Sequence, residues 1–348
     1  MKKSLKYGMT KKSRQRIFWA LVALFLLVAP PIILYTNGWR LTPDLKIKRT
    51  GGLFINTRLP GVEIYIDGEL KKRTNLLYGA AFFQGLTPKK ISVIAAKENY
   101  WPWTKELEIE ESVVTEAHPL LIPTSLEGKM VLRGSYINLY YLPNTGIIML
   151  EKEKGGLLTY EFYLYDLDEF LTPIQGKTLL SPPKRFKTFL MQQDTLKLIF
   201  EEYSVDVSFN RSSNTLTALK AAPHALTSPT LPHKTYLDIR SRGMIYITEN
   251  NKEIWGEWIS SDPLPYYFSE KKIKIFEAKT TVSSLDFYPK RRDVAIFASV
   301  NGIFAIELDG RGTRNFQPIY KGKNPTFTVV GNILYILDDG ILIKATLP

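Results

Sequence analysis

The sequence contains no cysteine and only three histidines. The lack of cysteine excludes disulfides, thiolate catalysis, iron–sulfur clusters and cysteine zinc sites. It leaves the compartment open, because an exported domain with a large core needs no disulfides. The histidines form no His-x-x-x-His pair of the kind that binds zinc: His118, His224 and His233. We therefore expect no metal and no cofactor.

Catalytic sequence motifs are also missing. There is no Gly-x-Ser-x-Gly elbow, no Gly-x-x-x-x-Gly-Lys loop and no Gly-x-Gly-x-x-Gly loop. Asp166, Asp168 and Glu169 resemble the start of a calcium loop, but the glycine and the distant glutamate are absent. Asp338-Asp339 precedes Gly340 and indicates a turn. We expect a non-enzymatic protein.

Positive charge is concentrated at the N-terminus. The chain has 46 Lys and Arg against 34 Asp and Glu, and seven of the basic residues lie in residues 1–16. The first 35 residues contain no acid, so the rest of the chain has 39 basic and 34 acidic residues. No later segment is basic enough to form a phosphate-binding arm. We therefore expect no nucleic-acid partner.

An uncharged apolar segment follows the basic tail directly. Residues 17–34 carry no charge, and as a helix they would span about 27 Å, close to the thickness of the hydrocarbon core. We predict a transmembrane helix over residues 17–35 that contacts the lipid bilayer through Ile17, Trp19, Leu24, Leu27 and Leu34. The orientation is set by cations on its N-terminal side: Lys11, Lys12, Arg14 and Arg16. We expect a single-pass protein of the cell membrane, with a cytoplasmic tail (1–16) and an ectodomain outside the cytoplasm.

A cleaved signal peptide and a buried core helix are the alternatives. A signal peptide has a shorter apolar region that ends in a small-x-small site, whereas here Ala29 is followed by Pro30 and Pro31. A core helix would not have a purely basic flank. The pattern favours an uncleaved anchor.

Alternating strands begin after a short linker at residues 36–50. In residues 51–123, alternation places Val62, Ile64 and Ile66 on one face, and Asp67-Gly68 predicts a hairpin turn. Similar runs recur up to Ile122. The spacing predicts a small antiparallel β-domain.

This segment resembles a PEGA domain. The resemblance rests on Pro60-Gly61-Val62, on Asp67-Gly68 and on a Tyr-x-Pro-Trp element that ends at Trp103. Two turns depart from the family pattern: residues 73–77 replace a Gly-x-Thr-Pro, and Lys89 replaces a glycine. The resemblance implies a β-domain of the envelope or cell surface with no established catalytic site.

Strand clusters recur every 40 to 50 residues in residues 124–348. They begin near residues 135, 185, 236, 285 and 327, and this spacing is typical of propeller blades. The segment 303–312 resembles part of a WD40 blade, although the Gly-His and Trp-Asp signatures are missing. We predict a β-propeller-like domain of about five blades, with a β-sandwich as the alternative.

Four tryptophans are candidate ligand contacts: Trp101, Trp103, Trp255 and Trp258. Aromatic rings stack on glycans and peptides, and they also fill cores. We expect a mainly β membrane-anchored envelope protein that binds or organises an envelope polysaccharide or a surface protein. The alternative is an exported enzyme that acts on glycans or the cell wall, with carboxylates in the propeller channel.

Overall fold

The computed structural model divides the chain into two units. The first comprises residues 1–98 and 102–121, and the second comprises residues 99–101 and 122–348. The residues described are 11–36, 38–41, 47–142, 145–165, 171–174, 186, 188–192, 195–200, 203–210, 213, 215–221, 236–238 and 242–348.

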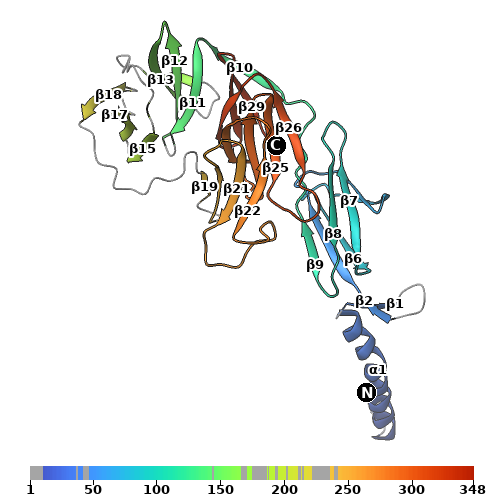
Figure 1. Cartoon of the computed structure of the whole chain (residues 1–348). Helices are drawn as coiled ribbons and strands as arrows, with labels where there is room; N and C mark the ends of the chain where they lie inside the picture. Colours follow the sequence, from blue (N-terminus) through green and yellow to red (C-terminus); the bar gives the residue numbers. More distant parts are fainter. Residues whose placement is uncertain are drawn as a thin grey trace, which may run out of the picture. The chain divides into compact units, whose positions relative to one another are not determined.

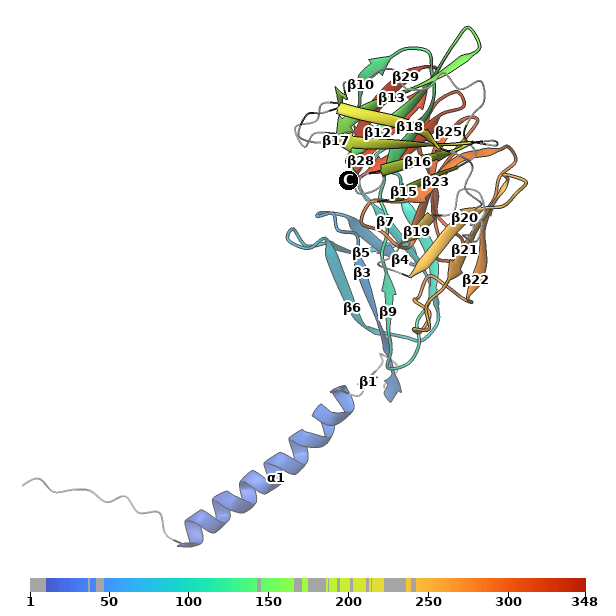
Figure 2. The same ribbon diagram turned by 90° about the vertical axis from the view of Figure 1, so that its left-hand side faces the viewer.

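The first unit opens with α1 (Lys11–Thr36), the long helix in Figures 1 and 2. None of its residues is buried, and it is long and apolar enough to cross a membrane. The helix begins at Lys11 rather than at Ile17, so the four predicted topology residues lie within its first turns. Pro30 and Pro31 lie inside the helix, which continues to Thr36.

Nine short strands follow α1 in the first unit. They are β1 (Trp39–Leu41), β2 (Ile47–Arg49), β3 (Gly51–Asn56), β4 (Glu63–Ile66), β5 (Glu69–Arg73), β6 (Ala80–Leu86), β7 (Lys90–Ala96), β8 (Trp103–Glu108) and β9 (Val114–Ala117). β1 and β2 form a hairpin, and the other strands form a three-stranded sheet in the order β6-β3-β9 and a four-stranded sheet in the order β5-β4-β7-β8. β3 and β9 pair in parallel, and the remaining pairs are antiparallel.

Alternation along the strands builds the core of the first unit. Val62 and Ile64 are fully buried and Ile66 is 5% exposed, as the sequence predicted. Asp67 and Gly68 both have positive φ, at 52° and 83°, and this backbone matches the predicted tight hairpin turn between β4 and β5.

The second unit contains the strands from β10 onward. They are β10 (Gly128–Arg133), β11 (Tyr136–Leu142), β12 (Ile147–Lys154), β13 (Leu157–Tyr165), β14 (Leu171–Pro173), β15 (Thr188–Gln192), β16 (Thr195–Ile199), β17 (Ser204–Asn210), β18 (Thr215–Ala221), β19 (Tyr236–Asp238), β20 (Gly243–Ile247), β21 (Glu253–Trp258), β22 (Lys272–Glu277), β23 (Val282–Phe287), β24 (Val294–Ser299), β25 (Gly302–Glu307), β26 (Phe316–Lys321), β27 (Thr326–Val330), β28 (Ile333–Asp338) and β29 (Ile341–Thr346).

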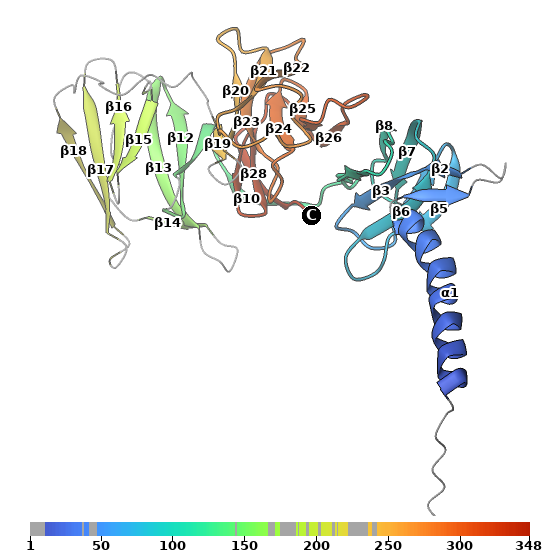
Figure 3. The same ribbon diagram turned by 90° about the horizontal axis from the view of Figure 1, so that it is seen from below.

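These strands form antiparallel sheets of four. Four sheets follow the chain order: β11–β14, β15–β18, β19–β22 and β23–β26. The fifth has the order β10-β29-β28-β27, so the first strand of the unit pairs with the last. Four antiparallel strands in chain order are typical of propeller blades, and in Figure 3 the strands of β15–β18 stand next to those of β12–β14.

Neighbouring sheets pack through nonpolar side chains. One cluster joins β11–β14 to β15–β18, another joins β11–β14 to the sheet of β27–β29, and a third joins β19–β22 to β23–β26. β23 also lies beside β27. The prediction of a mainly β chain with one N-terminal helix is confirmed, and the second unit is propeller-like.

Candidate functional site

Trp101 and Trp103 do not share a surface. Trp103 starts β8 in the first unit and is 1% exposed, so its ring is part of the core. Trp101 belongs to the second unit and is 37% exposed. The two rings flank Pro102 in sequence, but they do not form one aromatic platform.

Trp255 and Trp258 lie on opposite faces of β21, because side chains alternate along a strand and the residues are three apart. Trp258 is 8% exposed and packs in the cluster between β19–β22 and β23–β26. Its indole nitrogen donates to the carbonyl oxygen of Asp262 at 3.0 Å. Trp255 is only partly buried, and of these two rings it is therefore the one available to a ligand.

A cation and a second ring accompany Trp255. Tyr246 on β20 lies directly opposite Trp255 in the antiparallel register. The Lys272 ammonium nitrogen is 5.3 Å from the centre of the Trp255 ring and 5.7 Å from that of Tyr246, within the range of cation–π attraction. Tyr246 itself is only 9% exposed. We call the group formed by Tyr246, Trp255 and Lys272 the Trp255 face.

Charged side chains border the Trp255 face. Glu253 accepts a hydrogen bond from the Trp255 indole nitrogen at 3.0 Å and another from Lys274 at 3.1 Å, and these two bonds lower the pKa of Glu253. Lys274 also donates to Glu277 at 2.7 Å. The tryptophan orientation is thus fixed by a carboxylate, and its ring is flanked by donors and acceptors. A ring flanked in this way suits the stacking of a hydroxyl-rich ligand.

Trp255 was a candidate from the sequence, whereas Tyr246 and Lys272 were not. The available signal was the alternation in residues 271–275, which puts Lys272 and Lys274 on one face of a strand. The register that brings this strand to β21 could not be read from the sequence.

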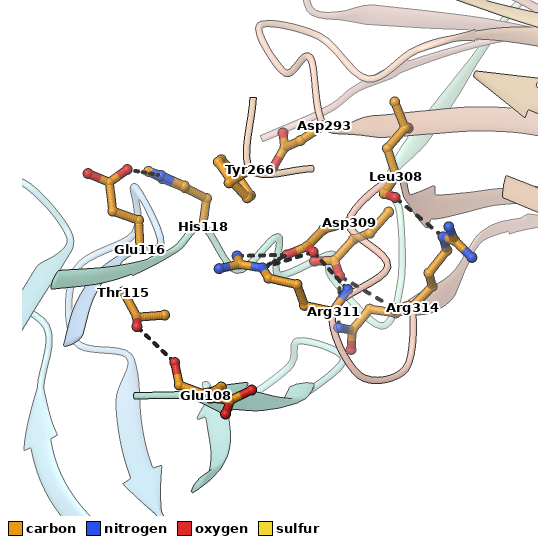
Figure 4. A network of polar contacts seen from close by, with 12 residues as sticks. Glu108, Thr115, Glu116, His118, Tyr266, Asp293, Leu308, Asp309, Arg311 and Arg314 are labelled. Atoms are coloured by element: carbon orange, nitrogen blue, oxygen red, sulfur yellow. Dashed lines mark hydrogen bonds and ion pairs between the residues drawn. The ribbon is translucent and has the colours of Figure 1, made fainter. Parts of the chain in front are cut away.

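A polar network in β23–β26 and nearby loops contains the other notable group of charges (Figure 4). Arg291 donates to both oxygens of Asp293 at 2.7 Å, and the Tyr266 hydroxyl donates to Asp293 at 2.6 Å. Arg291 and Asp293 are 6% and 8% exposed. Burial alone would raise the pKa of Asp293, but Arg291 and Tyr266 reverse this and lower it.

Two further carboxylates in the network also accept hydrogen bonds from side chains. Asp309 accepts from Arg311 at 2.9 Å, and the guanidinium carbon of Arg311 lies 4.9 Å from the Tyr266 ring centre. Glu307 accepts from the Asn315 side chain at 3.0 Å. Burial lowers the pKa of Arg314, whose guanidinium donates to the carbonyl oxygen of Leu308 (Figure 4). The network neutralises its own charges, which is typical of a structural ion-pair cluster.

Carboxylates of the sheet β11–β14 are also bonded. Glu151 is fully buried and accepts from the Asn138 side chain at 2.6 Å. Glu161 accepts from Tyr163 at 2.7 Å and from Lys152 at 3.1 Å. These hydrogen bonds hold the two carboxylates in place within the sheet.

Asp286 on β23 differs from these carboxylates. It accepts a hydrogen bond from the backbone N–H of Phe287 at 2.7 Å. Burial raises the pKa of Asp286 from 3.8 to about 7, so this carboxyl group changes charge near neutral pH.

The described residues contain no group of three or more His, Asp or Glu side chains that could hold a metal ion. His118 lies 3.5 Å from a carboxylate oxygen of Glu116, in the first unit (Figure 4). His224 and His233, and the acidic residues 166, 168 and 169, lie outside the described residues.

The five predicted membrane contacts are all exposed on α1. Their exposed fractions range from 43% for Ile17 to 73% for Leu27. A helix with this composition near the N-terminus is a membrane anchor or a signal sequence.

No protein-family model matches the sequence, and no curated protein matches it. Among solved structures, the chain is similar to Kluyveromyces lactis Hsv2 at 10% identity, covering 74% of this chain and 68% of that chain with a TM-score of 0.26. A gluconolactonase of Xanthomonas campestris shows 10% identity, coverage of 74% and 82%, and a TM-score of 0.29. A Trichoderma reesei protein of carbohydrate-active enzyme family AA12 shows 9% identity, coverage of 65% and 97%, and a TM-score of 0.38. Similarity at this level supports no conclusion about activity.

Proposed function

We propose that this protein is a single-pass membrane protein of the cell envelope whose β units lie outside the cytoplasm. The observation that carries the proposal is α1, a helix of 26 residues with no buried side chain. Its apolar stretch follows seven basic residues and no acid, and such a flank stays on the cytoplasmic side.

The β units hold a non-catalytic binding surface above the membrane. In this proposal the two sheets built from β3–β9 follow the anchor along the chain and precede the second unit, in keeping with the PEGA resemblance of residues 51–122. The second unit is a five-bladed propeller in this proposal, and the pairing of β10 with β29 supports it by joining the two ends of the unit.

The ligand in this proposal is an envelope polysaccharide that stacks on the Trp255 face. Sugar rings present C–H groups to an aromatic ring and hydroxyls to neighbouring polar groups. The Trp255 ring lies beside Lys272 and Glu253, which supply a donor and an acceptor. Asp293, Asp309, Glu151 and Glu161 are bonded to arginine, lysine, tyrosine or asparagine, and this pattern favours binding over glycan hydrolysis. Asp286, whose pKa is raised to about 7 by burial, is the carboxyl group on which the alternative of an exported glycan-acting enzyme depends.

The test uses full-length protein in detergent and polysaccharide fractions prepared from cell envelopes. Trp255→Ala should weaken binding about tenfold, because stacking on an aromatic ring is worth roughly 1–2 kcal/mol. Trp101→Ala is the matched control, since Trp101 is exposed but far in sequence from the Trp255 face. Equal polysaccharide binding by wild type and Trp255→Ala, or capture of proteins alone, would overturn the ligand assignment.

A further inference from the structure

The hairpin β1–β2 begins three residues after the end of α1, at Trp39. It is tied to the first unit through Thr50, which is 6% exposed. The backbone N–H and the hydroxyl of Thr50 both donate to the carbonyl oxygen of Gly38 at 2.9 Å, and the N–H of Ser112 donates to the carbonyl oxygen of Thr50 at 3.1 Å. Gly38 has a φ of 83°, a conformation that favours glycine. These hydrogen bonds therefore make the hairpin an ordered part of the first unit.

Aromatic rings orient the cations of this hairpin. The guanidinium carbon of Arg40 lies 3.5 Å from the centre of the Tyr35 ring, and Arg40 donates to the carbonyl oxygens of Tyr35 and Trp39. The guanidinium carbon of Arg49 lies 5.1 Å from the Trp39 ring centre. These contacts hold both arginines beside the end of the apolar helix.

Two cations lie directly opposite each other in the hairpin. The register pairs Arg40 with Lys48, and like charges at such positions destabilise a strand pair. In the part of the chain that the structure describes, no carboxylate forms an ion pair with Arg40, Lys48 or Arg49. An anion from outside the chain would relieve this repulsion.

A hollow of about 570 Å³ lies beside these cations, lined by Trp39, Lys48, Arg49, Thr87, Pro88 and Glu111. Lys48 and Arg49 are exposed. The headgroup layer extends the bilayer by roughly 5–8 Å on each side of the hydrocarbon core. A hairpin that begins three residues beyond the helix therefore lies at headgroup depth, where tryptophan and tyrosine also concentrate.

We infer that the β1–β2 hairpin and this hollow bind the phosphate headgroup of an anionic phospholipid in the leaflet on the ectodomain side. The inference rests on the proposed anchoring by α1. Lys48 and Arg49, which line the hollow, provide the positive charge. Trp39 packs against the glycerol and upper acyl region. Glu111 also lines the hollow, and its negative charge offsets part of the positive charge of the two cations.

The test compares lipid retention by full-length protein in detergent, measured by native mass spectrometry with equal amounts of phosphatidylglycerol and phosphatidylcholine. Wild type should retain phosphatidylglycerol preferentially. Lys48→Gln/Arg49→Gln should reduce that preference at least fivefold, whereas Arg49→Lys, which keeps the charge, should preserve it. Lys71→Gln/Lys72→Gln on β5 is the matched control, because it removes two exposed cations elsewhere in the same unit. The basic N-terminal tail is identical in all variants.

An unchanged preference in Lys48→Gln/Arg49→Gln would overturn the inference. Displacement of phosphatidylglycerol by an equal concentration of inorganic phosphate would also overturn it, since the site would then recognise free phosphate. The unfolding midpoint of each variant checks that the fold is kept. Alkaline extraction of membranes separates the two proposals: a chain that stays in the membrane without lipid preference contradicts only the headgroup site, whereas an extracted wild-type chain contradicts the anchor.

Discussion

The ammonium nitrogen of Lys272 lies 5.3 Å from the centre of the Trp255 ring, on a strand adjacent to the one that carries the tryptophan. This relationship distinguishes Trp255 from Trp258, which lies on the other face of β21 in a nonpolar cluster. A ring with a neighbouring cation can hold a ligand and orient it. A ring within the core contributes to stability alone.

Lys272→Gln should weaken polysaccharide binding about two- to fivefold, because the Lys272 ammonium beside the Trp255 ring is the proposed donor to ligand hydroxyls, and one hydrogen bond contributes roughly 0.5–1 kcal/mol. Lys321→Gln, which removes an exposed lysine from β26, is the control and should leave binding unchanged. Isothermal titration calorimetry with the purified polysaccharide measures both variants. Equal losses in the two variants would point to non-specific charge attraction.

Trp103→Ala should destabilise the first unit by about 3–5 kcal/mol, because removal of a large buried aromatic ring leaves a cavity. Trp103 is 1% exposed, whereas Trp101 is 37% exposed, so Trp101→Ala should change stability by less than about 1 kcal/mol. The free energy of unfolding of both variants is measured by denaturant unfolding that is followed by limited proteolysis. Similar stability of both would show that Trp103 is not a core residue.

Asp293→Asn should destabilise the second unit by about 3–5 kcal/mol, because Arg291 would remain buried without its carboxylate. The pKa of Asp293 lies below its usual value, so the stabilisation is present at neutral pH and is lost as the pH falls through this lowered pKa. Unfolding at pH 7 and at pH 3 measures the effect. The difference between wild type and Asp293→Asn should shrink at the lower pH, and a constant difference would contradict the ion-pair account.

Asp286→Asn should remove a pH dependence of stability whose sign is opposite to that of Asp293. Because burial raises the pKa of Asp286 from 3.8 to about 7, the folded state binds a proton that the unfolded state releases between these values. The contribution of the Asp286 carboxyl to the free energy of unfolding is fully present below about pH 4 and is lost as the pH rises to about 7. Allowing for partial solvent exposure, the resulting change in the free energy of unfolding is on the order of 2 kcal/mol. Thermal unfolding between pH 4 and pH 8 tests this: Asp286→Asn should be more stable than wild type at pH 8, and a variant less stable than wild type there would refute the account.

Local patterns predicted much of the fold. Alternation identified the buried faces around Val62 and Ile64, and Asp-Gly pairs identified turns such as Asp339-Gly340, where both residues have positive φ. These features depend on neighbouring residues alone, so the sequence reveals them.

Long-range pairing could not be predicted. Two strand pairs join segments that are far apart in the chain: β3 with β9 in parallel, and β10 with β29 in antiparallel orientation. The roles of the tryptophans depended on the same information, because only the register of β20–β22 places Tyr246 and Lys272 beside Trp255. The candidate site therefore depends on tertiary structure, although Trp255 was already a candidate from the sequence.

The location of the C-terminus tests the central claim most directly. A reporter fused after Pro348 and active only outside the cytoplasm should give a signal, while the intact chain, with the N-terminal helix still attached, remains in the membrane fraction after alkaline extraction. A cytoplasmic reporter signal, or a mature chain that begins near residue 30, would contradict anchoring by α1.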